Sequence, residues 1–498
     1  MLDYLVQSGD ISRPDGLQAT WYHRANKKEE MNKALASDAM ILEADVTLEG
    51  YGTVSEQPIP IMAHPPDIFS DNTLGQWLDA VLTSRKGIKL DFKTLASVGH
   101  SLDLLQQKNS TQEINRPVWL NADVLPGPNT PDFVLPVNGT VFLQLIQERF
   151  PVVTLSPGWK VSYGPPLFTE SYTRSMVEDM YSLIKDVPQK VTFPVHALLV
   201  RKGWQHLSWL LRQSSRFSLT LWQGSIHPNV SDLLFVRDNT HPSRVYYDIY
   251  EPTLSLFKEA AGQRSRIRSF YPGGDLMDFL CPDDRVTTSS VCSSLSVHWS
   301  PVTDRLSVLA QLKDGSGGML VCQVSAVVDG GEEGSEAVTL EDLLDLLAQS
   351  PDAPWGIYLQ VHSLKLLEAS LMSLNAAHSS GLLHRPVWIS VDGLQSSEQT
   401  QFVSRVEKIF PYVTLVLTGQ QWPPCLPAAV SSVSQRVVLR LHSALLPEEE
   451  QELHAGAQAL DRFDVAVEEQ SAAQVLNAAL RKRAGRPSTT VYVVRGTF

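Results

Sequence analysis

The sequence predicts an α/β protein built from two tandem (β/α)8 TIM-barrel-like domains. The first observation behind this prediction is an internal repeat: "RPVWLNAD" at 116–123 returns as "RPVWISVD" at 385–392, and "FPVVTL" at 150–155 returns as "FPYVTL" at 410–415. The second observation is that short apolar runs alternate with longer helix-compatible segments in the first copy. Eight strands with helices between them in about 250 residues are typical of a (β/α)8 barrel, and an open doubly wound sheet is the alternative.

Further matches occur in the same order along the 498-residue chain. "LDYL" at 2–5 matches "MDFL" at 277–280, and at the same spacing His23 in "TWYHRAN" is opposite His298 in "SVHWSP". Each copy is much longer than the roughly 20–50 residues of a solenoid repeat, so each is expected to be a complete domain. The predicted organisation is a first barrel at 1–255, a linker at 256–271 and a degenerate second barrel at 272–498.

The strands of the first copy are predicted from its apolar runs. The candidate strands lie at 17–23, 40–48, 59–64, 87–92, 117–123, 152–157, 191–199 and 217–223. Amphipathic segments between several of them predict helices at 27–36, 72–84 and 171–187.

Composition excludes some classes of function. The formal net charge is −13 and no long Lys/Arg block occurs, which argues against a nucleic-acid binder. No apolar window approaches the length of a membrane span, and the first residues do not resemble a signal peptide. Three Asn-x-Ser/Thr triplets, at Asn109, Asn138 and Asn229, would suit a lumenal or secreted glycoprotein. Cys281 and Cys292 are close enough in sequence to form a disulfide.

The stretch "ILEADVTLEG" at 41–50 places two carboxylates inside an apolar strand. Successive side chains of a strand point to opposite faces, so Glu43 and Asp45, two residues apart, point to the same side. Two like charges on a buried face repel and lose hydration unless a cation compensates both, and a divalent metal is the simplest compensator. A solvent-facing side of the strand is the alternative explanation.

Other polar residues occur at or near the ends of the first four candidate strands. They are His23, His64 and the pair Lys89 and Asp91. In a (β/α)8 barrel, the active site is built at the carboxyl ends of the strands. Histidines there suit general acid and base chemistry, since imidazole titrates near neutral pH. The alternatives are that each histidine is structural and that Lys89 only pairs with a carboxylate.

At these residues the sequence resembles the menorin family. The matching motifs are "HRAN" at 23–26, "ILEADV" at 41–46, "MAHPP" at 62–66 and "KLDFK" at 89–93. The family's domain is similar to glycerophosphodiester phosphodiesterases and spider-venom phospholipase D enzymes, and the tandem arrangement resembles its two-domain vertebrate members. Menorin-type proteins are regarded as extracellular or membrane-associated.

The resemblance implies a role for each site residue. His23 and His64 match the acid and base, and Lys89 lies beside the site and would stabilise a phosphoryl anion. The implied ligands of one Mg²⁺ or Ca²⁺ ion are Glu43, Asp45 and Asp91. The implied reaction is cleavage of a phospholipid or glycerophosphodiester-like substrate, with attack by water or by a hydroxyl of the substrate. The alternative is a non-catalytic interaction protein with cell-surface partners.

The second copy lacks these residues in the sequence alignment. Gln323 is opposite Glu43, Ser325 opposite Asp45, and Tyr358 and Gln360 replace Lys89 and Asp91. The chain between "VVDGG" and "TLEDLLDLL" is too short to hold an equivalent of His64. Because neutral residues cannot hold a hard cation tightly, the second copy is expected to be a structural or binding module.

Overall fold

The computed structural model describes most of the chain and divides it into two compact units. The first unit comprises residues 1–211 and 216–263, and the second comprises 212–215 and 264–498. The described residues are 1–162, 170–263, 270–280, 292–324, 338–391, 396–418, 433, 435–441, 464–468 and 489–495.

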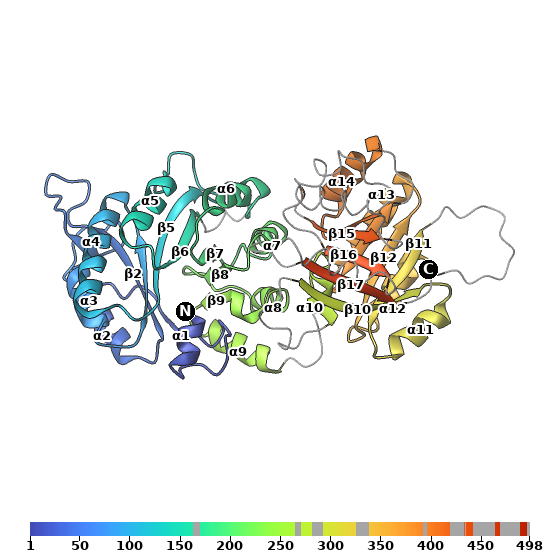
Figure 1. Cartoon of the computed structure of the whole chain (residues 1–498), viewed down its shortest axis with the longest axis horizontal. Helices are drawn as coiled ribbons and strands as arrows, with labels where there is room; N and C mark the ends of the chain where they lie inside the picture. Colours follow the sequence, from blue (N-terminus) through green and yellow to red (C-terminus); the bar gives the residue numbers. More distant parts are fainter. Residues whose placement is uncertain are drawn as a thin grey trace. The chain divides into compact units, whose positions relative to one another are not determined.

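The first unit contains a barrel-like sheet of eight parallel strands with helices on its outside (Figure 1). In sheet order the strands are β1 (Trp21–Tyr22), β2 (Ile41–Leu48), β4 (Gly87–Phe92), β5 (Val118–Pro126), β6 (Thr154–Lys160), β7 (Val191–His196), β8 (Phe217–Trp222) and β9 (Val245–Asp248). The helices are α1 (Leu2–Gln7), α2 (Lys28–Ala36), α3 (Leu74–Val81), α4 (Leu95–Gln112), α5 (Gly139–Arg149), α6 (Arg174–Ile184), α7 (Trp204–Arg212), α8 (Val230–Asp238) and α9 (Thr253–Gln263).

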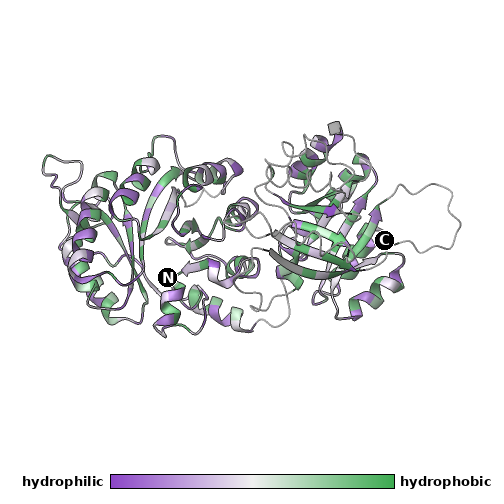
Figure 2. Cartoon of the chain, in the orientation of Figure 1, coloured by the Kyte–Doolittle hydropathy of each residue, from purple (hydrophilic) through white to green (hydrophobic). Residues whose placement is uncertain are grey.

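Local sequence explains these elements. Thr73 caps α3 by accepting from the Gln76 N–H, and Gln76 caps the Thr73 N–H in return, a capping box. Leu74, Leu78 and Val81 then line one buried face at helical spacing. The predicted helices at 27–36, 72–84 and 171–187 are confirmed as α2, α3 and α6. Across the chain, polar residues gather on helices and loops, whereas much of the strand ribbon is apolar (Figure 2).

One predicted barrel strand is wrong. The run 59–64 contains β3 (Pro60–Met62), which pairs antiparallel with β2 and lies outside the barrel order. Only residues 49–59 separate the two strands, and a parallel return needs a crossover of a dozen or more residues. The eighth barrel strand is instead β9, in "VYYD".

The seam between β1 and β9 is closed by turns and side chains. In the part of the chain that the structure describes, no ladder pairs these two strands. Instead, the Gly16 N–H donates to the Pro242 carbonyl at 3.0 Å, and a Cβ at Gly16 would lie 1.9 Å from the Val245 oxygen, so only glycine fits. His23 and Asp248 then meet across the seam, with Nδ1 2.8 Å from Oδ2.

The second unit is a closed parallel barrel of eight strands. In order these are β10 (Cys292–Pro301), β11 (Gly318–Val324), β12 (Trp355–Val361), β13 (Val387–Val391), β14 (Thr414–Thr418), β15 (Arg436–Leu441), β16 (Asp464–Glu468) and β17 (Thr489–Arg495). Its described helices are α10 (Leu276–Leu280), α11 (Arg305–Lys313), α12 (Leu340–Ala348), α13 (Leu364–Ser379) and α14 (Ser396–Ile409). The chain is therefore an α/β protein of two tandem TIM-like domains.

The strand register corrects the sequence alignment between the two copies. Gly87 on β4 pairs with Ile41, whereas the matching Gly356 on β12 pairs with Met319. Met319 in turn pairs with Trp299, as Ile41 pairs with Trp21. The counterpart of Trp21 is thus Trp299, and the predicted match of His23 with His298 is wrong.

The same register shifts β11 by two residues. Val321, which pairs with Tyr358, takes the place of Glu43, and Gln323, which pairs with Gln360, takes the place of Asp45. Ser325, the predicted counterpart of Asp45, lies outside the described residues.

Three further observations complete the fold. Cys322 is a free, buried cysteine, whereas Cys281 and the side chain of Cys292 lie outside the described residues. Among the described helices, none combines the length and apolar character that crossing a membrane requires. The helix α9 overlaps the start of the segment 256–271 that was expected to be a linker, and it belongs to the first unit.

Candidate metal centre and active site

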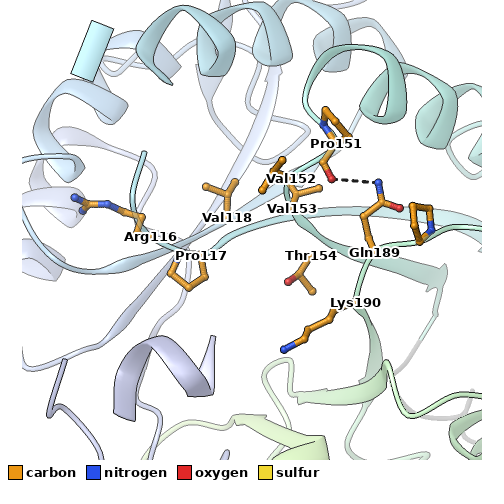
Figure 3. A pocket seen from close by; sticks show the side chains of 10 residues that line it. Arg116, Pro117, Val118, Pro151, Val152, Val153, Thr154, Gln189 and Lys190 are labelled. Atoms are coloured by element: carbon orange, nitrogen blue, oxygen red, sulfur yellow. Dashed lines mark hydrogen bonds between the residues drawn. The ribbon is translucent and has the colours of Figure 1, made fainter. Parts of the chain in front are cut away.

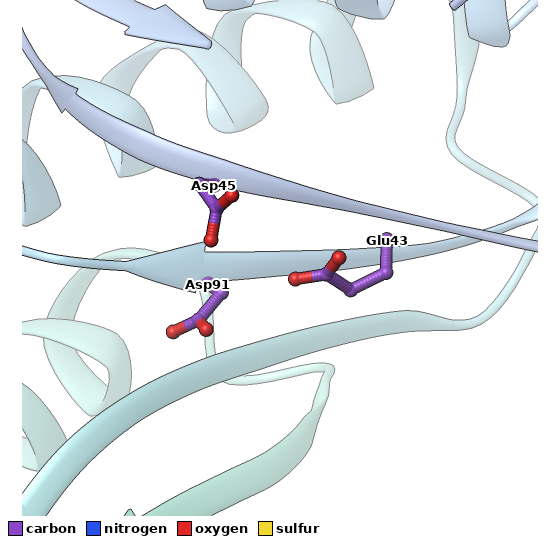
Figure 4. A group of neighbouring side chains, drawn as sticks. All are labelled: Glu43, Asp45 and Asp91. Carbon is purple, nitrogen blue, oxygen red and sulfur yellow. The ribbon is translucent and has the colours of Figure 1, made fainter. Parts of the chain in front are cut away.

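Three carboxylates from two neighbouring strands meet inside the first barrel. Glu43 and Asp45 lie on β2 and Asp91 lies on β4, where the register sets Asp45 directly opposite Asp91. One ligand oxygen from each residue lies within 4.8 Å of the others. Figure 4 shows the three carboxylates gathered on one side of the two strands. Glu43 and Asp45 are almost wholly buried.

Hydrogen bonds fix each carboxylate. The backbone N–H of Arg24 donates to Glu43 Oε2 at 2.8 Å, from a residue in the left-handed region with φ of 60°. Asn26 Nδ2 donates to Asp45 Oδ2 at 2.8 Å. On the other strand, Asn121 Nδ2 donates to Asp91 Oδ1 at 2.8 Å, and Ser156 Oγ fixes the amide of Asn121 in turn. The carboxylates are thus preorganised by neighbouring elements.

Lys93 contacts two carboxylates of this cluster, and Arg24 Nε lies 3.8 Å from Asp45 Oδ2 as well. The Nζ of Lys93 lies 3.0 Å from Asp45 Oδ1 and 2.5 Å from Asp91 Oδ2. Burial alone would lower the pKa of Lys93, but Asp91 and Asp45 raise it well above its ordinary value. Lys93 is therefore charged at neutral pH.

The two carboxylates of β2 respond differently to their surroundings. Burial raises the pKa of Glu43 above its usual range, although the charge of His23 opposes this. Burial acts in the same direction on Asp45, but Lys93 and the hydrogen bond from Asn26 lower the pKa of Asp45 to about 2. Asp45 is the firmly ionised member of the pair.

His23 lies at the end of β1 between two carboxylates. Its Nδ1 lies 2.8 Å from Asp248 Oδ2 and 3.4 Å from Glu43 Oε2. Burial alone would lower the pKa of His23, but Glu43 and Asp248 raise it to about 9. Because Nδ1 donates to Asp248, the ring orientation is fixed and Nε2 is left to face other groups.

His64 reaches the site through the hairpin rather than from a parallel strand. The Ala63 N–H donates to the Asp45 carbonyl at 3.1 Å, which places the next residue beside the cluster. The positive charge of protonated His64 lowers the pKa of the Asp45 carboxyl. The Nδ1 of His64 lies 2.6 Å from the Pro65 carbonyl oxygen, so Nδ1 donates to that oxygen, and in the neutral ring Nε2 is then the acceptor. The side chain is exposed at the mouth of the barrel.

Lys89 lies two residues before Asp91 on β4, farther from the carboxyl end of the strand. It is buried, and its Nζ lies 5.6 Å from the ring centroid of Trp21, in a cation–π contact. Trp21 packs on Trp119, and Trp119 packs on Tyr246 at 4.8 Å, which forms an aromatic floor below the carboxylates. Lys89 thus belongs to this floor, whereas Lys93 contacts the carboxylates.

Five residues of the site are not among those predicted from the sequence. They are Asn26, Lys93, Asn121, Asp123 and Asp248. The sequence contains a signal for two of them. Lys93 lies two residues after Asp91, and Asp123 lies two residues after Asn121, and residues two apart on a strand point to the same side. Burial and the nearby Asp91 raise the pKa of Asp123, which lies 3.6 Å from Lys160 Nζ.

The donor set fits one hard divalent cation. Three carboxylates supply oxygen ligands, and their spread of no more than 4.8 Å matches the roughly 4–5 Å between opposite oxygens around Mg²⁺ or Ca²⁺. A cation bound there would share Asp45 and Asp91 with the ammonium of Lys93.

Comparisons with known proteins identify the family. A family model described as the menorin N-terminal domain matches residues 15–254 and 322–482, which together are more than half of the chain. The chain belongs to the menorin family. Human Protein FAM151B is 46% identical to this menorin over 263 residues, which cover 53% of this chain and 93% of that protein.

Solved structures resemble the menorin chain only distantly. A tryptophan synthase complex from Pyrococcus furiosus is 16% identical, covers 40% of this chain and 86% of that chain, and has a TM-score of 0.28. Tryptophan synthase from M. tuberculosis in an aminoacrylate-bound form is 12% identical. The match covers 41% of this chain and 83% of that chain, with a TM-score of 0.27.

The second barrel keeps the aromatic floor without the three carboxylates, and the guanidinium of Arg440 lies 5.1 Å from the ring centroid of Trp299. Trp299, Trp388 and Tyr492 take the places of Trp21, Trp119 and Tyr246, and pack with ring centroids 5.1–6.1 Å apart. Tyr358 fills the place of Lys89 and packs edge to face against Trp299, with ring centroids 5.0 Å apart. The positions of the three carboxylates hold Val321, Gln323 and Gln360.

A separate cavity lies at the other end of the first barrel. It has a volume of about 440 Å³ and is lined by residues at the amino ends of β5, β6 and β7 (Figure 3). Gln189 Nε2 donates to the Pro151 carbonyl at 3.2 Å there, and Lys190 pairs with Asp3 at 3.0 Å. The carboxylate cluster lies toward the carboxyl ends of the strands, so this cavity is not its entrance.

Proposed function

We propose that the first barrel is a metal-dependent phosphodiesterase, a hydrolase or lyase that acts on a phospholipid or glycerophosphodiester-like substrate. The observation that carries the proposal is the convergence of three carboxylates, Lys93 and two histidines at one end of the barrel. The carboxyl end of the strands is where (β/α)8 barrels place their catalytic groups.

The cation would be Mg²⁺ or Ca²⁺, held by Glu43, Asp45 and Asp91. When bound, it would supply positive charge that polarises the phosphoryl group. Arg24, Asn26 and Asn121 keep the three carboxylates in place through the hydrogen bonds described above. Lys93, held between Asp45 and Asp91, would bind a phosphate oxygen through its ammonium.

The two histidines would share the proton transfers. His64 presents Nε2 as an acceptor at the mouth, so it suits the base that deprotonates water or a substrate hydroxyl. Protonated His23, with a pKa raised to about 9 by Glu43 and Asp248, suits the acid that protonates the leaving oxygen. The phosphorus–oxygen bond to the leaving group breaks as the bond to the attacking oxygen forms.

Turnover of a generic aryl phosphodiester tests this proposal. The full chain should hydrolyse bis(p-nitrophenyl) phosphate when Mg²⁺ or Ca²⁺ is added and stop when the ion is chelated. His23→Ala and His64→Ala should each lower turnover by roughly 10²–10⁴-fold and leave ion binding nearly intact. A chain that binds neither ion, or whose turnover ignores chelation, would contradict the proposal.

A non-catalytic menorin-type interaction protein, extracellular or membrane-associated, is the second candidate. The observation that favours it is that Lys93 already compensates Asp45 and Asp91, so the cluster is stable as a relict site. The second barrel, with neutral residues at the equivalent positions, would then be a recognition module for cell-surface partners. Calorimetric titration separates the candidates, because a relict site held by Lys93 would bind divalent ions weakly.

A further inference from the structure

Exposed apolar side chains gather on the loops around the mouth of the first barrel. Nine large apolar side chains are exposed among the described residues of the first unit, and six of them lie on three loops, 49–59, 63–72 and 127–138. We call five of these the apolar rim: Tyr51, Val54, Phe69, Phe133 and Leu135. Val54 is fully exposed, and Phe133 and Leu135 are 85% and 82% exposed. Exposed apolar residues concentrated at one end of a barrel indicate an interaction surface.

The three loops belong to the same end of the barrel as the carboxylates. Loop 49–59 follows the carboxyl end of β2, and loop 127–138 follows that of β5. These strands are the two neighbours of β4, which carries Asp91. The Gly50 N–H donates to the Ile68 carbonyl at 2.7 Å, which joins the loop that carries Phe69 to the hairpin tip.

The hairpin tip is held by its own hydrogen bonds. Gly50 has a φ of +66°, and a Cβ there would lie 2.7 Å from the Ser55 oxygen. Thr53 Oγ1 donates to the Gly50 carbonyl at 2.6 Å, and the Gly52 N–H donates to Glu56 Oε2 at 2.8 Å. The tip therefore holds Val54 in solvent rather than folding it onto the barrel.

The charge of these loops indicates what they contact. They contain five carboxylates and no lysine or arginine: Glu49, Glu56, Asp67, Asp71 and Asp132. Anionic lipids attract basic segments, so an acidic rim disfavours an anionic surface. Choline-type headgroups expose a cation outward, which complements the acidic loops. Separate apolar tips also suit a fluid surface, because a protein partner would need a complementary pocket for each tip.

We propose that the apolar rim enters the surface of a zwitterionic lipid bilayer and holds the mouth of the first barrel against it. This inference builds on the proposed phosphodiesterase, since it names a bilayer phospholipid as the substrate class. The apolar side chains would reach the boundary of headgroups and acyl chains, where interfacial proteins bury their apolar residues.

Vesicle flotation of the full chain tests the inference. Wild type should bind phosphatidylcholine vesicles, and the pair Phe133→Ser and Leu135→Ser should weaken binding at least about tenfold, because two apolar side chains no longer leave water. Added phosphatidylserine should not strengthen binding. Val152→Ser is the matched control, since Val152 is 89% exposed at the opposite end of the same barrel. Unchanged melting temperatures would show that the variants fold.

Three outcomes would overturn the inference: wild type that ignores phosphatidylcholine vesicles, a control that loses binding equally, or binding that requires phosphatidylserine. The first outcome would indicate that the apolar rim contacts a protein partner instead of a bilayer. Hydrolysis of the soluble aryl phosphodiester is the second readout, and the rim variants should retain it. If wild type binds vesicles through the rim but lacks this hydrolysis, the docking surface stands and the phosphodiesterase proposal fails.

Discussion

At the scale of residues, the first barrel solves the problem of burying several carboxylates in two ways. Hydrogen-bond donors such as Asn26 and Asn121 stabilise the charged forms of Asp45 and Asp91, and Lys93 lies between these two carboxylates. Lys89 does not take part in these contacts and faces Trp21 instead. The two lysines of "KLDFK" therefore have different roles despite lying on the same strand face.

Asp45→Asn should weaken divalent-ion binding at least about tenfold, because it removes one charge from the three-carboxylate set. The fold should persist, since Gln323 occupies the equivalent place in the second barrel. Calorimetric titration of Mg²⁺ and Ca²⁺ measures the change. Asp103→Asn is the control, because Asp103 is an exposed acid paired with Arg149. If Asp45→Asn binds as tightly as wild type, the carboxylates are not ligands.

Lys93→Met should destabilise the ion-free protein by roughly 3–5 kcal/mol, because it leaves the buried Asp45 and the half-buried Asp91 without their ammonium partner. Divalent ions should restore more stability to this variant than to wild type, since the ion no longer competes with Lys93. Thermal unfolding with and without Ca²⁺ or Mg²⁺ checks both effects. Lys89→Met is the comparison, and equal behaviour of the two variants would refute the separate roles.

At the scale of elements, an ion pair joins the segment just before β1 to α8. Asp15 accepts from both Nη atoms of Arg237, at 2.9 and 2.7 Å, and from the Leu17 N–H at 3.0 Å. Burial would raise the pKa of Asp15, but the hydrogen bonds and charge of Arg237 lower it below its usual value. This ion pair fixes the chain just before β1, the strand that His23 directly follows.

Asp15→Asn should lower the free energy of unfolding by roughly 3–5 kcal/mol at neutral pH. Because the folded pKa of Asp15 is depressed, its contribution is complete above the unfolded pKa of about 3.9 and is lost as the pH falls through the folded pKa. The gap between wild type and variant should therefore shrink below about pH 4. Denaturant unfolding across pH measures it, and a gap independent of pH would exclude the carboxylate as its source.

At the scale of the whole molecule, each unit has its own parallel barrel, and each barrel contains an aromatic floor of the same kind. The floor of Trp21, Trp119 and Tyr246 recurs in the second barrel, whereas the carboxylates do not. Packing at the floor is thus common to both barrels, whereas the three carboxylates belong to the first. This contrast supports a role for the charges other than folding.

A fragment of residues 1–263 should melt cooperatively, because it holds all eight strands and α9 of the first unit. A fragment of residues 1–255 should be less stable by roughly 3–5 kcal/mol, since it lacks Phe257, which is buried and packs on Tyr247 at 4.9 Å. Calorimetry of both fragments compares them. An insoluble or non-cooperative longer fragment would show that the first unit depends on the second.

The sequence by itself determined the tandem barrels, most strands of the first barrel and the shared side of Glu43 and Asp45. It could do so because repeats and period-two patterns are local properties of the chain. The same reasoning placed Asp91 and both histidines among the candidate residues, and the structure places these groups around one end of the barrel.

Only the tertiary structure decided the strand register, the hairpin return of β3 and the partner of His23. A period of two fixes the face of a residue but not its height along the barrel, so the alignment of Gln323 was off by two residues. Asp248 lies 225 residues from His23 in the chain, and closure of the barrel brings them to 2.8 Å. Contacts of this kind depend on how distant strands pack, and no local pattern carries that information.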